Sequence, residues 1–299
     1  MKKYFLITTE HLEDKLWFRD EGDFVVGMNY VALQALLSPE VLVLVFILMS
    51  NHVHFVLYGT KQEVSGFMNS FKSRYSLYLF RKYGVRAHLR ENDLHLCEIP
   101  SDETEALERA IAYVQMNCVA AGICAHPSQY PWGTGSSFFQ TLKLNSSELN
   151  RRGMRLADLS GRARKKLLHS DMDLNIPEGW TVSEAGYVLP ESYVSVDLVE
   201  RLFRNPNRLN YFLNSSSKAR KRLVAEEDSL PTFKDHVVVQ ALPDLIQGLF
   251  RKSCFEDLAP QEQAELLRQI RFRFSANIHQ AARVCGLSYA DAARLIDSV

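Results

Sequence analysis

The first 125 residues alternate between short apolar runs and longer stretches in which apolar residues recur every three or four positions. The short runs are rich in β-branched and aromatic residues, which favours strands, whereas the longer spacing favours helices. The expected elements are a strand at 4–9, a helix at 23–37, strands at 41–48 and 52–57, a helix at 62–82, a strand at 93–99 and a helix at 101–116 capped by Ser101 or Asp102. This order predicts an antiparallel, ferredoxin-like sheet with helices on one side.

The rest of the chain divides into an irregular stretch and a helical one. Residues 140–230 place two basic segments around an acidic one, and we expect a few helices there. Helical periodicity then returns at 235–250, 260–272, 277–285 and 289–298. The predicted fold is therefore α+β, with a catalytic domain at 1–140, a basic connecting subdomain at 141–230 and an all-α region at 231–299.

Two histidines open the second strand of the predicted hairpin. His52 and His54 are two residues apart, so on a strand their side chains share one face. Two imidazoles on one strand can supply two ligands of a metal ion. One core and one surface histidine on an ordinary strand is the alternative.

A tyrosine and an asparagine mark the helix expected at 101–116. Tyr113 and Asn117 are four residues apart and would share one helix face. If that face meets the histidine strand, two imidazoles and an amide oxygen form a mixed site that suits Mg²⁺ or Mn²⁺. The phenol would then be a nucleophile, activated by a metal or base because a free tyrosine has a pKa of roughly 10. A core tyrosine and a C-terminal helix asparagine are the alternative.

Other side chains with similar chemistry are interpreted as structural. Tyr75 falls on the apolar stripe of the helix at 62–82, and we expect it in the core. His95, on the strand expected at 93–99, is interpreted as a packed side chain rather than a further ligand.

Composition indicates a globular protein and leaves its partners open. Hydrophobic residues make up 46% of the chain, and no apolar run approaches the roughly 18 residues of a membrane span, so we expect no membrane partner. Five cysteines without a Cys-x-x-Cys pair suit reduced thiols, and the N-terminus lacks the features of a signal peptide, so we expect a cytoplasmic, nucleoid-associated protein.

Basic residues gather in three segments, although 35 basic and 35 acidic residues give no net charge. The segments are 61–90, 151–166 and 201–222, and each is poor in acidic residues. Solvated helix faces are the simplest explanation for one such cluster, but three favour a polyanionic partner.

Three linked motifs resemble those of one protein family. Met49-Ser50-Asn51-His52-Val53-His54, the segment Tyr113 to Gly122 and Tyr130-Pro131-Trp132 resemble, in order and spacing, the single-tyrosine HUH transposases. The closest branch is the REP-associated tyrosine transposases, which are bacterial insertion-sequence relatives. The chain departs from the family pattern at Cys118, where proline is frequent, and at Val85 to Asn92, which lacks a Gly-x-Leu-Trp-type segment.

The resemblance implies an enzyme that cleaves and rejoins single-stranded or hairpin DNA through a 5′-phosphotyrosine intermediate. Tyr113 matches the nucleophile, and His52, His54 and Asn117 match the ligands of Mg²⁺ or Mn²⁺. It is compatible with a monomer or a homodimer. The residues expected to contact this DNA are Lys72, Arg74, Tyr78, Arg81, Lys82, Arg151, Arg152, Lys165 and Lys166.

The last helices form a second candidate DNA-binding element. Residues 278–295 fit a helix-turn-helix, with Gly286 at the turn and small alanines between the helices. Tyr289 and Arg294 would then face the major groove of duplex DNA, whereas an ordinary helical hairpin is the alternative.

Two other functions fit parts of the sequence. One is a DNA-binding regulator that retains the transposase fold without turnover, and the other is a hydrolase whose metal site has no relation to DNA. A covalent adduct with DNA would separate the enzyme from the regulator, and salt-sensitive DNA binding would exclude the hydrolase.

Overall fold

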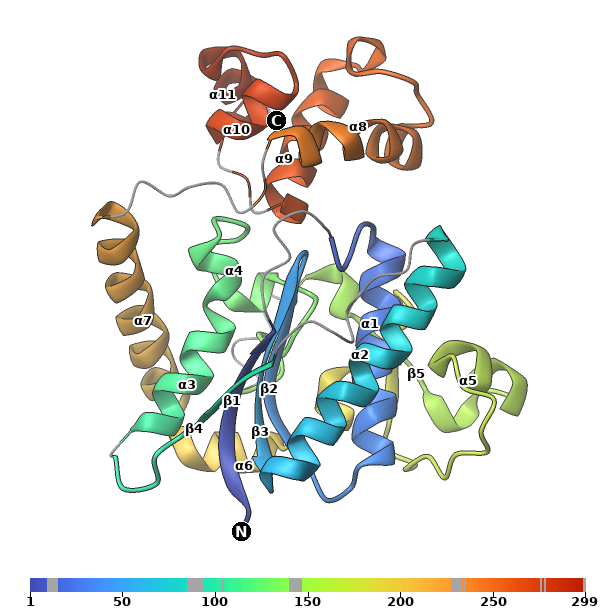
Figure 1. Cartoon of the computed structure of the whole chain (residues 1–299), viewed down its shortest axis with the longest axis vertical. Coiled ribbons are helices and arrows are strands. Elements are labelled where there is room, and N and C mark those ends of the chain that lie inside the picture. Colours follow the sequence, from blue (N-terminus) through green and yellow to red (C-terminus); the bar gives the residue numbers. More distant parts are fainter. Residues whose placement is uncertain are drawn as a thin grey trace.

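The computed structural model places a four-stranded antiparallel sheet in the first part of the chain (Figure 1). Its strands are β1 (Lys3–Thr9), β2 (Leu42–Met49), β3 (His52–Gly59) and β4 (Leu94–Glu98), in the spatial order β2-β3-β1-β4. The structure describes residues 1–9, 16–84, 94–103, 105–139, 147–226, 233, 235–274, 276 and 278–297, with backbone only at 217–226 and at a few later positions. The predicted α+β class and antiparallel sheet are confirmed.

Two long helices cover one face of the sheet. They are α1 (Glu21–Leu37) and α2 (Lys61–Tyr83), and each begins with a capping box, formed by Asp20 with Asp23 and by Thr60 with Glu63. On this face, Phe55 of β3 contacts Phe67 and Phe71 of α2, with ring centroids 6.1 and 6.0 Å apart. Burial of these aromatic rings fixes α2 on the sheet.

The next helices lie on the opposite face. They are α3 (Ala106–Gln115) and the short α4 (Asn117–Ala120), and α3 contacts β2 and β3. The expectation that the helices lie on one side of the sheet is therefore wrong. The expected cap is also wrong, because α3 begins at Ala106, after Glu105 with a φ of 68°.

The stretch after 147 completes the core of the sheet. It contains β5 (Arg152–Arg155), α5 (Gly161–Leu168), β6 (Thr181–Ser183), α6 (Val196–Phe203) and α7 (Pro206–Glu226). Val199, Phe203 and Phe212 are buried in the same core as the sheet, and α7 runs along α3 (Figure 1). The 3₁₀ turns are η1 (Pro127–Gln129), η3 (Glu148–Asn150), η4 (Leu156–Asp158), η5 (Pro190–Ser192) and η6 (Phe255–Asp257). The predicted division of the chain at residue 140 stays a prediction.

The C-terminal helices gather at one end of the molecule (Figure 1). They are α8 (Asp235–Phe250), α9 (Pro260–Phe274), α10 (Ile278–Val284) and α11 (Tyr289–Asp297), and they share a separate hydrophobic core. The predicted all-α region is confirmed. Arg273 of α9 donates a hydrogen bond to the carbonyl of Arg19, which joins this region to the segment before α1.

No helix among the residues that the structure describes combines the length and the apolar content that crossing a bilayer requires.

Candidate active site

Strand β3 holds the two histidines side by side on the face opposite α2. The rings of His52 and His54 are edge to face, with centroids 4.7 Å apart, and both side chains are buried. Neighbouring Val53 and Phe55 point to the α2 side, as the alternation of a strand requires. The predicted shared face of the pair therefore exists in the fold.

Each imidazole is oriented through its Nδ1 atom. The Nδ1 of His52 lies 2.7 Å from the side-chain oxygen of Asn51, and the Nδ1 of His54 lies 2.8 Å from the hydroxyl of Thr8. Because a side-chain amide oxygen only accepts, this contact is a hydrogen bond when His52 carries its proton on Nδ1. Partners of this kind fix the ring orientation of metal-binding histidines and direct the Nε2 atoms to the metal.

Tyr113 comes to the histidines from α3 of the same chain. Its ring meets that of His54 edge to face, with centroids 5.6 Å apart. The side chain is 37% exposed, in contrast to the buried imidazoles, so a large substrate can reach it. A single subunit therefore brings the predicted nucleophile to the predicted metal-binding strand.

Asn117 is the first residue of α4, because the helix is interrupted at Met116. Its Nδ2 donates to the carbonyls of Tyr113 and Val114, at 2.9 and 3.2 Å. The amide oxygen, which is the atom a metal ion would bind, takes no part in these two bonds. The side chain is buried and is held directly against the backbone of Tyr113.

The donor set fits the predicted divalent ion. Two imidazoles whose Nδ1 atoms are engaged and the amide oxygen of Asn117 are nitrogen and oxygen donors, which are the types that suit Mg²⁺ or Mn²⁺. In the described part of the chain, no three histidine, cysteine, aspartate or glutamate side chains gather as a metal site. That statement does not cover a metal site in which asparagine is one of the three ligands.

The third motif, Tyr130-Pro131-Trp132, is hydrogen-bonded to β2, the strand that precedes the histidine strand. Leu48, at the end of β2, donates its N–H to the carbonyl of Trp132 at 2.8 Å, and its carbonyl accepts from the hydroxyl of Tyr130 at 2.7 Å. Ser50 in the turn accepts from the N–H groups of Trp17 and Phe18. The three motifs of the sequence thus meet around one turn of the sheet.

The predicted DNA contacts of α2 lie on the other face of the sheet. Lys72 is 2% exposed, so it is not at the surface that a phosphate contact requires. Tyr78 and Lys82 both bind the buried carboxylate of Asp23, each at 2.7 Å. Arg74 and Arg81 remain at least partly exposed there. Residues 85–90, the end of the first basic segment, lie outside the described residues.

Two tyrosines of α2, Tyr75 and Tyr78, are held by hydrogen bonds in buried or partly buried surroundings. Tyr75, next to Tyr78, is fully buried as expected and donates to the carbonyl of Trp17. Burial raises the pKa of Tyr78 and Tyr75 alike, and the charge of Asp23 raises both further. Neither phenol is therefore suited to act as the nucleophile.

The second basic segment lies on and beside the two-stranded antiparallel sheet formed by β5 and β6. Arg151 and Arg152 are exposed at β5, and Arg151 is paired with Glu148 and Glu184. On α5, Lys166 is exposed and Lys165 pairs with Asp173 at 2.8 Å. Because α5 packs against α1, this group also lies away from Tyr113.

The predicted groove-facing residues of the C-terminal region are at its surface. Tyr289 is 51% exposed at the start of α11, and Arg294 on the same helix pairs with Asp291 at 2.5 Å. Gly286 has a φ of 69° in the turn before α11, a conformation in which glycine is favoured.

Sequence reasoning missed two features of the Tyr113 face. His95 is exposed rather than packed, so that interpretation is wrong, and it lies opposite Thr8 on the face that carries His54. Arg208 of α7 binds Glu105 and Glu108, both at 3.1 Å, and so joins α7 to α3. The basic segment at 201–222, which contains no acidic residue, was the sequence signal for the contact that Arg208 makes.

Comparison with models of known families, with curated proteins and with solved structures finds no significant match to this chain.

Proposed function

We propose that this protein is a metal-dependent HUH-type DNA strand transferase and endonuclease, a transposase that acts on single-stranded or hairpin DNA. The observation that carries the proposal is the contact between Tyr113 and His54, because an exposed phenol then lies beside a pair of oriented imidazoles. The strand order β2-β3-β1-β4 is compatible with the ferredoxin-like domain that this class requires.

In the proposed reaction, the phenol oxygen of Tyr113 attacks the phosphorus of one phosphodiester. The bond from phosphorus to the 3′ oxygen breaks, so the strand retains a 3′ hydroxyl after proton transfer and the 5′ phosphate is esterified to the tyrosine. A 3′ hydroxyl then attacks this ester, restores a phosphodiester and releases the phenol. The total number of ester bonds is conserved, and no external energy source is needed.

The chain's own residues have separate parts in this proposal. His52, His54 and the amide oxygen of Asn117 would hold Mg²⁺ or Mn²⁺, which would supply Lewis-acid polarisation of the phosphate. Asn51 and Thr8 orient the two imidazoles through their Nδ1 atoms. The bonds from Asn117 to the carbonyls of Tyr113 and Val114 hold the Asn117 side chain against the backbone of the nucleophile.

The C-terminal helices would bind duplex DNA in this proposal. Helices α10 and α11 flank a turn at Gly286, and the buried Ala281, Ala282 and Ala292 let helices pack closely. This supports a helix-turn-helix with Tyr289 and Arg294 toward the groove. A cytoplasmic, nucleoid-associated location follows from such a partner.

The test is formation of a covalent complex with labelled hairpin DNA in the presence of Mn²⁺. The native protein is expected to give a band that survives denaturing electrophoresis. Tyr113→Phe and EDTA should each abolish it, while Tyr211→Phe, which changes a 63% exposed tyrosine of α7, should not. An adduct that persists in Tyr113→Phe would refute the nucleophile, and DNA binding without any adduct would favour the regulator.

A further inference from the structure

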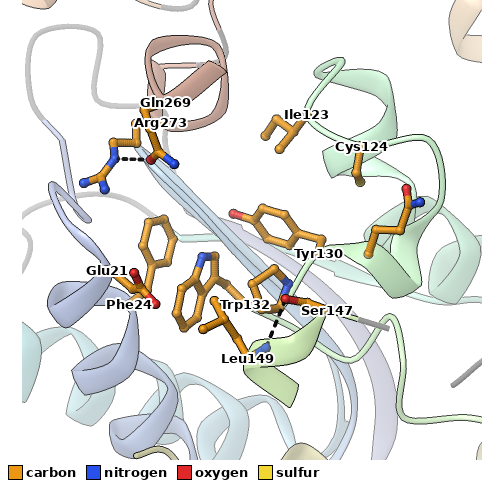
Figure 2. A pocket seen from close by; sticks show the side chains of 12 residues that line it. Glu21, Phe24, Ile123, Cys124, Tyr130, Trp132, Ser147, Leu149, Gln269 and Arg273 are labelled. Carbon is orange, nitrogen blue, oxygen red and sulfur yellow. Dashed lines mark hydrogen bonds between the residues drawn. The ribbon is translucent and has the colours of Figure 1, made fainter. Parts of the chain in front are cut away.

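A pocket of about 420 Å³ lies between the sheet domain and α9 (Figure 2). One side is aromatic and is built from Phe24 of α1 and from Tyr130 and Trp132. The facing side carries Gln269 and Arg273 of α9, and Glu21 lies at the edge (Figure 2). The volume is within the range of small-molecule sites and exceeds what a single ion needs.

The aromatic side is closely packed and offers one unsatisfied donor. The rings of Phe24 and Trp132 are stacked, with centroids 5.0 Å apart and planes 13° apart. Trp132 is 2% exposed, and its Nε1 has no hydrogen-bond partner among the described residues. Figure 2 shows this nitrogen on the ring edge nearest the open space of the pocket. A buried donor of this kind requires an acceptor, which a bound molecule can supply.

The facing side adds donors without a net positive charge. Arg273 is 6% exposed and uses Nε for Gln269 and Nη1 for the carbonyl of Arg19, so its Nη2 has no acceptor in the described part of the chain. Burial lowers the pKa of Arg273, and the charges of Asp20, Glu21 and Asp23 oppose that effect. Glu21 lines the pocket, and its carboxylate disfavours a free anion there. A neutral molecule with both acceptors and donors fits better.

We propose that this pocket binds one unstacked nucleobase of the DNA substrate, an inference that rests on the DNA-processing function proposed above. The base would accept hydrogen bonds from Trp132 Nε1 and Arg273, and donate an amino or imino hydrogen to Glu21. Hydrogen bonds to the edges of splayed bases are one way in which proteins recognise single strands.

The position of the pocket connects it to the candidate active site. Tyr130 and Trp132 are bonded to Leu48, four residues before His52 in the chain. Ile123 and Cys124, which also line the pocket, follow α4 and therefore Asn117. A base fixed here would set the register of the strand relative to Tyr113.

The experiment is a ligand-observed NMR titration of the full chain with the four deoxynucleosides and, separately, with inorganic phosphate. At least one nucleoside is expected to bind, and phosphate is not. Trp132→Phe keeps an aromatic ring and removes the N–H, and it should weaken nucleoside binding about tenfold. Trp180→Phe is the matched control, since Trp180 is buried in a different cluster, and it should bind as the native chain does.

A second variant avoids any change in the core. Glu21→Gln alters an exposed side chain and should lower the affinity for bases with an exocyclic amine more than that for thymidine. Binding of phosphate alone, no binding of any nucleoside, or equal affinities in Trp132→Phe and Trp180→Phe would overturn the proposal. Nucleoside binding without a covalent adduct would leave the pocket standing and refute the transferase function. A covalent adduct without nucleoside binding would refute the pocket proposal and leave the transferase function standing.

Discussion

Tyr113 combines two properties that a nucleophile toward DNA requires. Its ring contacts the buried His54, and more than a third of the side chain stays exposed. The two tyrosines of α2 named above lack one of these properties, since Tyr75 is buried and Tyr78 is held by Asp23. The difference comes from the faces of the sheet, because Tyr113 lies on the face that α1 and α2 do not cover.

Thr8 gives a test of the histidine pair at the scale of one residue. Thr8→Val removes the hydroxyl that binds Nδ1 of His54 and leaves the shape of the side chain nearly unchanged. We expect Mn²⁺ affinity to fall by about 10- to 100-fold, as is typical when the partner of a metal-binding histidine is lost. Calorimetric or electron paramagnetic resonance titration measures the effect, and Thr8→Ser is the control that keeps the hydroxyl. Equal affinities in the two variants would exclude the orienting role of Thr8.

At the scale of elements, the segment around Trp132 holds the end of β2. Gly133 pairs with Ile47, and a Cβ added there would lie 2.6 Å from the carbonyl oxygen of Phe46. We expect Gly133→Ala to reduce the free energy of unfolding by about 2 kcal/mol, because backbone atoms rather than a flexible side chain must move.

The control for this substitution is Gly161→Ala at the start of α5, where a Cβ meets nothing within 4 Å. Its free energy of unfolding should be unchanged or up to about 1 kcal/mol higher, since alanine favours a helix. Urea denaturation measures both variants. Similar values for the two would mean that the Trp132 segment does not restrain β2.

The short helix η1, just before this segment, carries a pH-dependent cap. Nδ1 of His126 accepts from the N–H of Ser128 at 3.2 Å, and only the neutral imidazole can do so. Burial lowers the pKa of His126 below its ordinary value near 6.5, although a hydrogen bond with Asn210 opposes the shift. The unfolded chain therefore binds this proton first, and the stabilisation present above pH 6.5 is lost as the pH falls through the folded-state pKa.

We accordingly expect the free energy of unfolding to be lower at pH 5 than at pH 7. His126→Asn keeps an acceptor that does not titrate, so this variant should show a smaller difference between the two pH values. Some dependence will remain, because burial also lowers the pKa of His169. Denaturation curves at both pH values are the measurement, and an unaltered difference in His126→Asn would contradict the role of the cap.

At the scale of the whole molecule, the two faces of the sheet have different surroundings. Helices α1, α2 and α5 lie on one side, whereas α3 and α7 lie on the other with Tyr113 (Figure 1). Most of the basic residues first expected to bind DNA are on the α2 side or beside it. Arg208 and the exposed Tyr211 of α7 are on the Tyr113 side.

Local pattern predicted the elements of the sheet well, because alternation and helical spacing reflect burial within one element. The shared face of His52 and His54 followed from the same rule. The sequence pattern did not predict which polar residues are buried in the fold. Lys72 has the polarity of a surface residue and is nonetheless buried. Contacts between residues far apart in the sequence were not predicted either. Arg208 lies 100 residues after its partner Glu108.

We propose that Tyr113 is the residue that becomes joined to DNA. Digestion of the adduct formed with Mn²⁺ and hairpin DNA, followed by mass spectrometry of the peptides, locates the attached nucleotide directly. The nucleotide is expected on the peptide that contains Tyr113, as a 5′-phosphotyrosine. A nucleotide on any other tyrosine, or no nucleotide on any peptide, would contradict this assignment.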